Sequence, residues 1–269
     1  MKKFIAIIFL FTCHFSNSQP VGMAGSAVSV KIKAANDTMK LKGDSTQFYT
    51  GSTNKRAFSA KPETQCCKAT SLIAPAALIT YGIVALNNNA VRNLDITTSR
   101  TIKAGNSNFK NNADNYLQYA PALAVYGLNA IGIKGKNNLV DRSVMFGLST
   151  ILTAAIVSTI KPLSNIQRPD GSAANSFPSG HTTTAFAAAE FLHQEYKHRS
   201  PLYSILGYAA ATTTGILRMY NNKHYLSDVV AGAGFGMLST KIVYWIYPVI
   251  KRKIAGRKSA SANRSAVIS

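Results

Sequence analysis

The chain has 269 residues, of which 46% are hydrophobic and 15% are charged, and its formal net charge is +20. This length supplies enough material for one large domain or two small ones. The excess positive charge indicates an anionic partner. Because no basic helix with interleaved aromatic residues occurs, the sequence argues against nucleic acid and favours a membrane surface or an anionic substrate.

The first 68 residues are expected to contribute little to a folded core. Residues 1–18 indicate a secretory signal, with two lysines before an apolar run that is too short to span a bilayer comfortably. Residues 19–68 are polar and predict a flexible arm. The adjacent Cys66 and Cys67 lack the spacing of zinc ligands, and we interpret them as structurally incidental thiols.

From residue 69 onward, apolar segments predict helices separated by polar stretches. Six such segments occur, at residues 71–86, 119–133, 143–160, 181–196, 203–217 and 229–250. In the fourth, five residues fall on one face at helical spacing: Ala185, Ala188, Ala189, Leu192 and Tyr196. With almost no strand signal, the pattern predicts an all-α domain, a six-helix bundle over residues 69–250. Residues 251–269 carry six cations and no acidic residue, and we expect a disordered tail.

The sequence leaves membrane placement open, with a slight preference for an exported domain outside the bilayer. Several apolar segments have only about 15 residues, against the ~20 that a membrane-spanning helix needs. Lys241 lies in the sixth segment and Glu190 in the fourth, and charges are costly in lipid. The basic stretches between segments nevertheless fit six spanning helices. The expected location is the periplasm or cell envelope, with integral inner-membrane placement as a close alternative.

Three polar segments lie at the ends of predicted helices, and each carries cations or imidazoles. An antiparallel bundle would bring them to one end. The first segment contains Lys161 and Arg168, whose ammonium and planar guanidinium groups suit the several oxygens of one phosphate. Taken alone, this pair would also fit a solvated basic loop.

The second segment, Pro178-Ser179-Gly180-His181, directly precedes a predicted helix. Backbone N–H groups near Ser179 and Gly180 would therefore point at a bound anion, and glycine lets the main chain come close. His181 at this position could give a proton to a leaving alkoxide.

The third segment runs from Arg218 to Asp228 and supplies a further cation and a second imidazole. His224 and Asp228 are four residues apart, so on a helix the carboxylate would hold one ring nitrogen and leave the other free as a nucleophile. If the stretch is a loop, this spacing argument fails and only proximity remains.

Together the three segments resemble the signature of the type 2 phosphatidic acid phosphatase (PAP2) superfamily, which includes class A acid phosphatases, lipid phosphatases and vanadium haloperoxidases. Its K-x6-R-P and P-S-G-H motifs are matched in full at residues 161–169 and 178–181. The third motif, S-R-x5-H-x3-D, ends at Asp228 and is matched except that Leu217 replaces the serine. The resemblance covers about residues 71–248. It implies a helical bundle whose active site lies at one end and faces the periplasm.

The resemblance also implies a phosphatase that needs no metal or cofactor and hydrolyses a phosphomonoester or lipid diphosphate through a phosphohistidine. The phosphoryl oxygens would be bound by five residues: Lys161, Arg168, Ser179, Gly180 and Arg218. His224 would attack phosphorus with the support of Asp228. His181 would protonate the leaving group and then activate the water that hydrolyses the intermediate.

Several alternatives remain open at this point. The substrate is either a soluble phosphate ester or a membrane lipid such as phosphatidate, isoprenyl diphosphate or lipid A. The same pocket would suit a vanadate-dependent haloperoxidase. Leu217 and the basic ends of the chain also fit a non-catalytic protein that binds anions.

Overall fold

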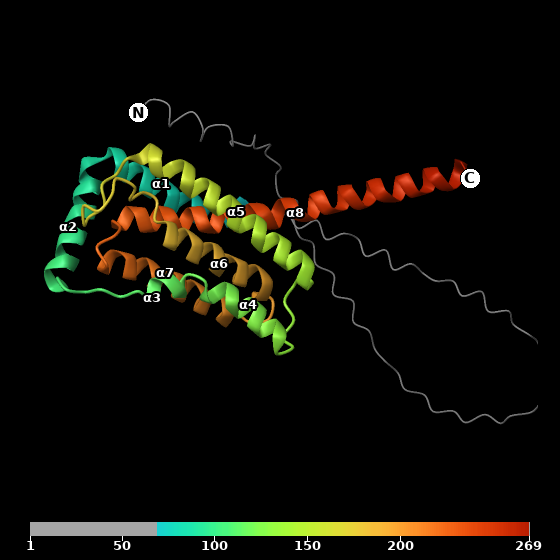
Figure 1. The fold of residues 1–269 in the computed structure, drawn as a ribbon, viewed down its shortest axis with the longest axis horizontal. Helices are drawn as coiled ribbons and strands as arrows, with labels where there is room; N and C mark the ends of the chain where they lie inside the picture. Colours follow the sequence, from blue (N-terminus) through green and yellow to red (C-terminus); the bar gives the residue numbers. More distant parts are fainter. Residues whose placement is uncertain (1–68, 269) are drawn as a thin grey trace, which may run out of the picture. The chain divides into compact units, whose positions relative to one another are not determined.

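The structure is a computed structural model that describes residues 69–268, with side chains for residues 69–254 (Figure 1). The predicted signal at residues 1–18, the arm at 19–68 and the Cys66-Cys67 pair lie outside the described residues. Within 69–268 the chain forms eight α-helices and one short 3-10 helix and contains no strand. The all-α prediction is confirmed for this part of the protein.

Six of the eight helices match the predicted apolar segments, and two were not predicted. The helices are α1 (Ile73–Asn87), α2 (Asn89–Gly105), α3 (Ala113–Leu117), α4 (Ala120–Ala130), α5 (Leu139–Ser164), α6 (Gly180–Tyr196), α7 (Pro201–Tyr220) and α8 (Leu226–Ile268). A 3-10 turn, Ala69–Leu72, leads into α1.

The prediction of six helices is wrong by two because α2 and α3 are not apolar runs. On α2, Asp95 is buried while Asn93 is exposed, and a helix with charged and polar residues throughout escapes a search for apolar segments. Asn88 caps α2, since its side chain accepts hydrogen bonds from the backbone N–H groups of Ala90 and Val91 at 2.9 and 3.3 Å. α3 has only five residues, too few to show a period.

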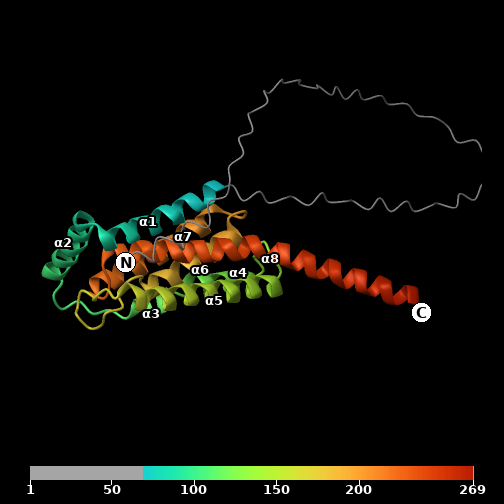
Figure 2. The same cartoon turned by 90° about the horizontal axis from the view of Figure 1, so that it is seen from above.

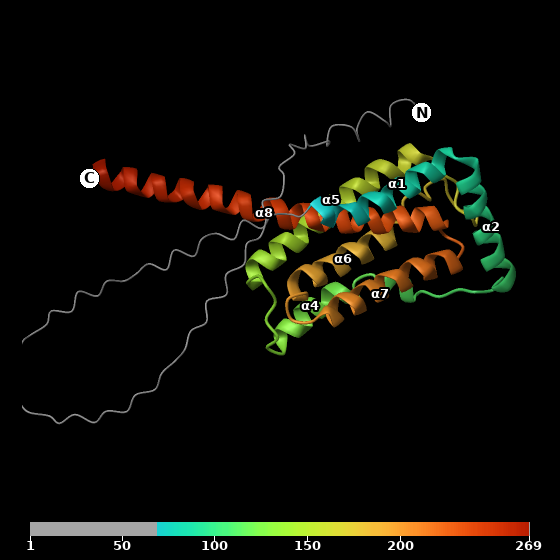
Figure 3. The ribbon, with the colours of Figure 1, turned by 180° about the vertical axis from the view of Figure 1, so that it is seen from behind.

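α6 is the central helix and packs against α4, α5, α7 and α8, while α1 lies along α8 (Figures 2 and 3). The face of α6 that the sequence predicted is buried: Ala185, Ala188, Ala189, Leu192 and Tyr196. Small residues permit close approach, because a Cβ added at Gly236 of α8 would lie 2.2 Å from the Thr183 carbonyl oxygen of α6. This tight contact fixes the position of α8 against α6, including the first residues of α8.

Three helices are long and apolar enough to cross a membrane: Thr70–Asn87, Leu139–Ser164 and Leu226–Ile254. α5 has 26 residues, and its length of roughly 39 Å exceeds the ~30 Å hydrocarbon core of a bilayer. Large apolar side chains also point outward, for example Leu148 and Ile151 of α5, which are 45% and 66% exposed. These findings favour integral membrane placement over the exported domain that the sequence slightly preferred.

The two charges that argued against a membrane pair with each other inside the bundle. Lys241 Nζ on α8 lies 2.8 Å from Glu190 Oε1 on α6, and the Glu190 side chain is fully buried. Glu190 also accepts hydrogen bonds from Tyr208 Oη at 2.5 Å and from Gln194 Nε2 at 2.6 Å. These two charges therefore do not count against membrane placement, because both have partners in the protein and neither has to face lipid.

Replacing Lys241 by methionine is expected to destabilise the protein by on the order of 3 kcal/mol, because Glu190 then keeps a buried charge without its partner. The measurement is unfolding of the purified protein in detergent. The control is Lys251→Met, which removes a solvent-exposed pair with Asp141 and should cost less than about 1 kcal/mol. Adding Glu190→Gln to Lys241→Met should recover most of the loss. Equal stability of the two single variants would contradict the prediction.

α8 continues through Ile268, past the other helices (Figure 1). The basic sequence predicts a disordered tail at residues 251–269, but the structure is helical to Ile268. The segment is rich in alanine, lysine and arginine, which have high helix propensity, so charge alone was a poor guide to disorder here.

Candidate active site

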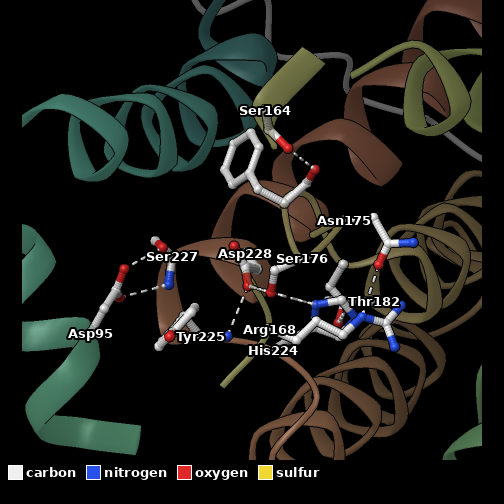
Figure 4. A network of polar contacts seen from close by, with 12 residues as sticks. Asp95, Ser164, Arg168, Asn175, Ser176, Thr182, His224, Tyr225, Ser227 and Asp228 are labelled. Atoms are coloured by element: carbon white, nitrogen blue, oxygen red, sulfur yellow. Dashed lines mark hydrogen bonds and ion pairs between the residues drawn. The ribbon is translucent and has the colours of Figure 1, made fainter. Parts of the chain in front are cut away.

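The loop between α5 and α6 meets the junction of α7 and α8 at one end of the bundle (Figure 1), and Figure 4 shows polar contacts between them. Ser176 Oγ in this loop lies 3.4 Å from His224 Nδ1 and donates to Asp228 Oδ2 at 2.5 Å. Immediately before α6, the chain reaches the same point, since the Ser179 N–H donates to the Asp228 carbonyl at 3.0 Å. The second and third polar segments of the sequence are therefore in direct contact.

Asn175 of this loop holds the two cations of the first segment. Lys161 Nζ, in the last turn of α5, donates to the Asn175 carbonyl at 2.6 Å. Arg168 Nε donates to Asn175 Oδ1 at 2.9 Å. Asn165, the residue after α5, is in the left-handed conformation (φ 47°), which turns the chain so that both cations reach one asparagine.

Arg218, the third predicted cation, is buried at the end of α7 and is held by α3. Its Nη1 lies 2.7 Å from Asp114 Oδ2. Its Nε is buried and has no hydrogen-bond partner among the residues that the structure describes. Because an unpaired buried donor is costly, this guanidinium is suited to a further acceptor. Leu217, at the position of the serine in the motif, is half-buried beside it.

His224 and Asp228 are close together, although they do not share a helix. His224 lies in the turn before α8, and Asp228 lies in the first turn of α8. Asp228 Oδ2 is 3.6 Å from His224 Nδ1 and accepts the Tyr225 N–H at 2.8 Å, as the acidic residue of a capping box does. The helical-spacing argument therefore does not apply, and proximity remains. Since Asp228 faces Nδ1, Nε2 of His224 is the ring nitrogen left for chemistry.

The two histidines share an electrostatic environment that disfavours their protonated forms. His181, in the first turn of α6, has its Nε2 2.8 Å from Asn115 Oδ1 of α3. Burial, and then the charge of Arg218, lower the pKa of His181 to about 4. Burial also lowers the pKa of His224, although Asp228 opposes this. Both imidazoles are therefore neutral near pH 7 when no anion is bound.

Ser179 and Gly180 lie at the start of α6, as the sequence predicts. The Ser179 N–H is occupied by Asp228, and its hydroxyl lies 2.9 Å from Thr182 Oγ1. A Cβ added at Gly180 would lie 3.9 Å from Lys161 Cε, so the glycine backbone borders the lysine side chain. The N–H groups of Gly180 and its neighbour, at the start of the helix, are the amides best placed for an anion.

A cavity of about 680 Å³ opens beside Lys161, Gly180 and His181. It follows α5 from Lys161 back to Phe146, which is roughly 22 Å of helix. α6 forms the facing wall as far as Ala188. Lys161 and His181 of the site therefore stand at one end of a long groove between α5 and α6.

The walls of this groove present mainly carbon. Several α5 residues that line it carry hydroxyl groups, but Ser149, Thr150 and Ser158 donate them to backbone carbonyls of α5 itself, at 2.8, 3.0 and 2.7 Å. Such bonds satisfy the hydroxyl and leave its carbon atoms facing the space. The groove is thus suited to an apolar chain attached to an anionic head.

A comparison with models of protein families matches residues 142–252 to the PAP2 superfamily. Residues 142–252 belong to this superfamily. All three motifs named in the sequence analysis, at residues 161–169, 178–181 and 217–228, fall within the matched region. The resemblance inferred from them is therefore confirmed.

Individual relatives include proteins named for lipid substrates. The chain is 34% identical over 207 residues to lipid A 1-phosphatase of Porphyromonas gingivalis, a match that covers 72% of this chain and 46% of that protein. It is 38% identical over 74 residues to the bacitracin transport permease protein BcrC of Bacillus licheniformis, covering 28% and 34%. The chain thus spans less than half the length of each of these two curated relatives.

Among solved structures, the chain is similar to a transmembrane PAP2-type phosphatidylglycerolphosphate phosphatase from Bacillus subtilis. The sequence identity is 21% and the TM-score is 0.45, and the match covers 66% of this chain and 98% of that one.

Sequence reasoning missed the residues that hold the PAP2 motifs in place. Asp114 and Asn115 of α3 contact Arg218 and His181, and the loop residues Asn175 and Ser176 make the contacts described above. None of these contact residues belongs to a motif or falls in a periodic pattern. Two features of the sequence could have indicated them. Asp114 and Asn115 lie in a polar stretch just before a predicted helix, and Asn175 and Ser176 lie shortly before Pro178.

Proposed function

We propose that the protein is a membrane-embedded phosphatase that hydrolyses a phosphomonoester of a membrane lipid. One observation carries this proposal: Lys161 and His181 line one end of a long groove with apolar walls, and the asparagine that holds Lys161 there also holds Arg168. The cations suit the phosphoryl oxygens, and the groove suits the hydrocarbon part of the substrate. A soluble ester would leave most of the groove unused.

In the proposed reaction, neutral His224 attacks phosphorus through Nε2, and the bond from phosphorus to the ester oxygen breaks. The product is a phosphohistidine and a free alcohol. Lys161, Arg168 and Arg218 neutralise the charge on the three equatorial oxygens, so side chains supply what metal ions supply in other phosphatases. Asp228 beside Nδ1 stabilises the positive charge that the ring gains.

His181 acts as the acid and then as the base. Burial and then the neighbouring cations keep it neutral in the ligand-free site, but a phosphate anion bound among those cations opposes their effect. An adjacent negative charge favours the protonated form, so the pKa of His181 rises when substrate binds. His181 can then protonate the leaving oxygen and, once neutral again, remove a proton from the water that attacks the phosphohistidine.

The distribution of basic residues supports a site on the outer face of the membrane. The ends of α5 and α6 that lie away from the site carry basic residues, and the Arg199 side chain there donates to the Lys134 carbonyl at 3.2 Å. Lys251 of α8 pairs with Asp141 at the start of α5. Basic residues at this end favour a cytoplasmic position for it under the positive-inside rule, which leaves the phosphatase site outside.

The names of the relatives support lipid A 1-phosphate as the first substrate to test. The purified chain in detergent is expected to release phosphate from a lipid A 1-phosphate faster than from a short soluble alkyl phosphate. EDTA should leave both rates unchanged, because no step uses a metal. Release from neither ester would refute the proposed function.

The groove itself can be tested by filling it. Ala154→Trp, which places an indole in the groove, is expected to raise KM for the lipid phosphate by about 30-fold, since it blocks burial of the hydrocarbon chain. The rate with the soluble ester should not change. Ala155→Trp is the matched control, because Ala155 is exposed and does not line the groove. Equal effects of the two variants would contradict the assignment of the groove.

A further inference from the structure

The turn that carries His224 is held by α2, a helix that lies outside the region matched to the PAP2 family. Arg92, Asp95 and Ser99 have the spacing i, i+3, i+7 and therefore share one face of α2. Their partners are three residues on both sides of His224: Asn222, Tyr225 and Ser227. α2 thus contacts the chain both before and after the proposed nucleophile.

Asp95 makes the strongest of these contacts. Its side chain is fully buried, and its Oδ1 accepts the backbone N–H of Ser227 at 3.0 Å. Its Oδ2 accepts the hydroxyl of the same serine (Figure 4). Ser227 lies in the first turn of α8, where backbone N–H groups have no partner within the helix and a carboxylate is favoured.

Arg92 and Ser99 hold the other side of the turn. The Arg92 guanidinium carbon lies 4.4 Å from the centre of the Tyr225 ring, within the range of a cation–π contact. Ser99 Oγ lies 3.4 Å from Oδ1 of Asn222, whose φ of 57° is left-handed. A turn with such a backbone depends on its surroundings to stay in one conformation.

We propose that Asp95 is a positioning residue for the reaction: by fixing Ser227, it sets the place of the adjacent Asp228 and so the orientation of His224. This inference rests on the proposed function. The binding cations Lys161 and Arg168 belong to α5 and its loop, and Arg218 is held by Asp114 of α3, so a displaced α8 start should leave most of the substrate binding intact. The effect of losing Asp95 should therefore appear in kcat and not in KM.

Asp95→Ala is expected to lower kcat about 100-fold for both an aryl phosphate and the lipid phosphate, with KM changed less than about threefold. The losses should be equal for the two esters, because the nucleophile is displaced and the acid His181 is not. Asp95→Asn keeps the size and one acceptor and should recover kcat to within about 10-fold of wild type. The control, Asn93→Ala, alters an exposed position of α2 and should match wild type.

If Asp95 only stabilises the fold as a cap of α8, Asp95→Ala should lower the unfolding midpoint and leave the kcat of the folded protein unchanged. That outcome overturns the inference, as does a loss confined to KM. If Asp95→Ala does not fold, Ser227→Ala decides, because it removes only the hydroxyl donor; kcat about fivefold lower supports the inference, and wild-type kcat overturns it. A wild-type protein that hydrolyses neither ester refutes the proposed function, and this inference with it.

Discussion

Replacing His224 by alanine is expected to lower kcat for every phosphate ester by on the order of 10⁵-fold or more, because no other group in the site can form the covalent intermediate. The ring is 2% exposed, and Asp228 and Ser176 both face its Nδ1, which leaves Nε2 for the attack on phosphorus. Phosphate release from the lipid ester by the purified variant measures the effect.

The control for this variant is His198→Ala. His198 is exposed at the end of α6 away from the site, so its loss should leave kcat and KM unchanged. A His224→Ala protein that folds normally and retains more than about 1% of the wild-type rate would exclude His224 as the nucleophile.

The second large effect is expected for His181→Ala and depends on the leaving group. For an alkyl or lipid ester the leaving alkoxide needs a proton, so the rate of the first turnover should fall about 10²- to 10⁴-fold. For an aryl phosphate, whose phenolate leaves without help, the first turnover should slow by less than about 10-fold. Rapid-mixing measurements with both esters separate the two cases. Equal losses would remove His181 from the role of acid.

Much of the fold could be predicted because burial imposes a period on the sequence. The buried face of α6, from Ala185 to Tyr196, follows directly from helical spacing of small and apolar residues. α2 could not be predicted in this way, because its inner face carries Arg92 and Asp95, which pack against polar groups of the α7–α8 turn. Their burial depends on partners more than 120 positions away along the chain.

The slight preference of the sequence for an exported domain has a related cause. Lys241 and Glu190 each count against a membrane span when they are considered alone, and the sequence does not show that they pair at 2.8 Å. The same limit applies to the site. The chemistry of Lys161, Arg168 and His181 could be predicted from residue type and motif. Their partners could not, because Asn175 and Asn115 were brought to them only by folding.

The phosphorylated enzyme gives the most direct test of the central claim, that His224 accepts the phosphoryl group. In His181→Ala the water of the second step loses its base, so the intermediate should accumulate when the variant is mixed with a radiolabelled aryl phosphate. The account predicts about one label per chain, stable to alkali, labile to acid and located on the peptide that contains His224. Label on another residue, or no label although the first turnover releases the phenol, would contradict the account.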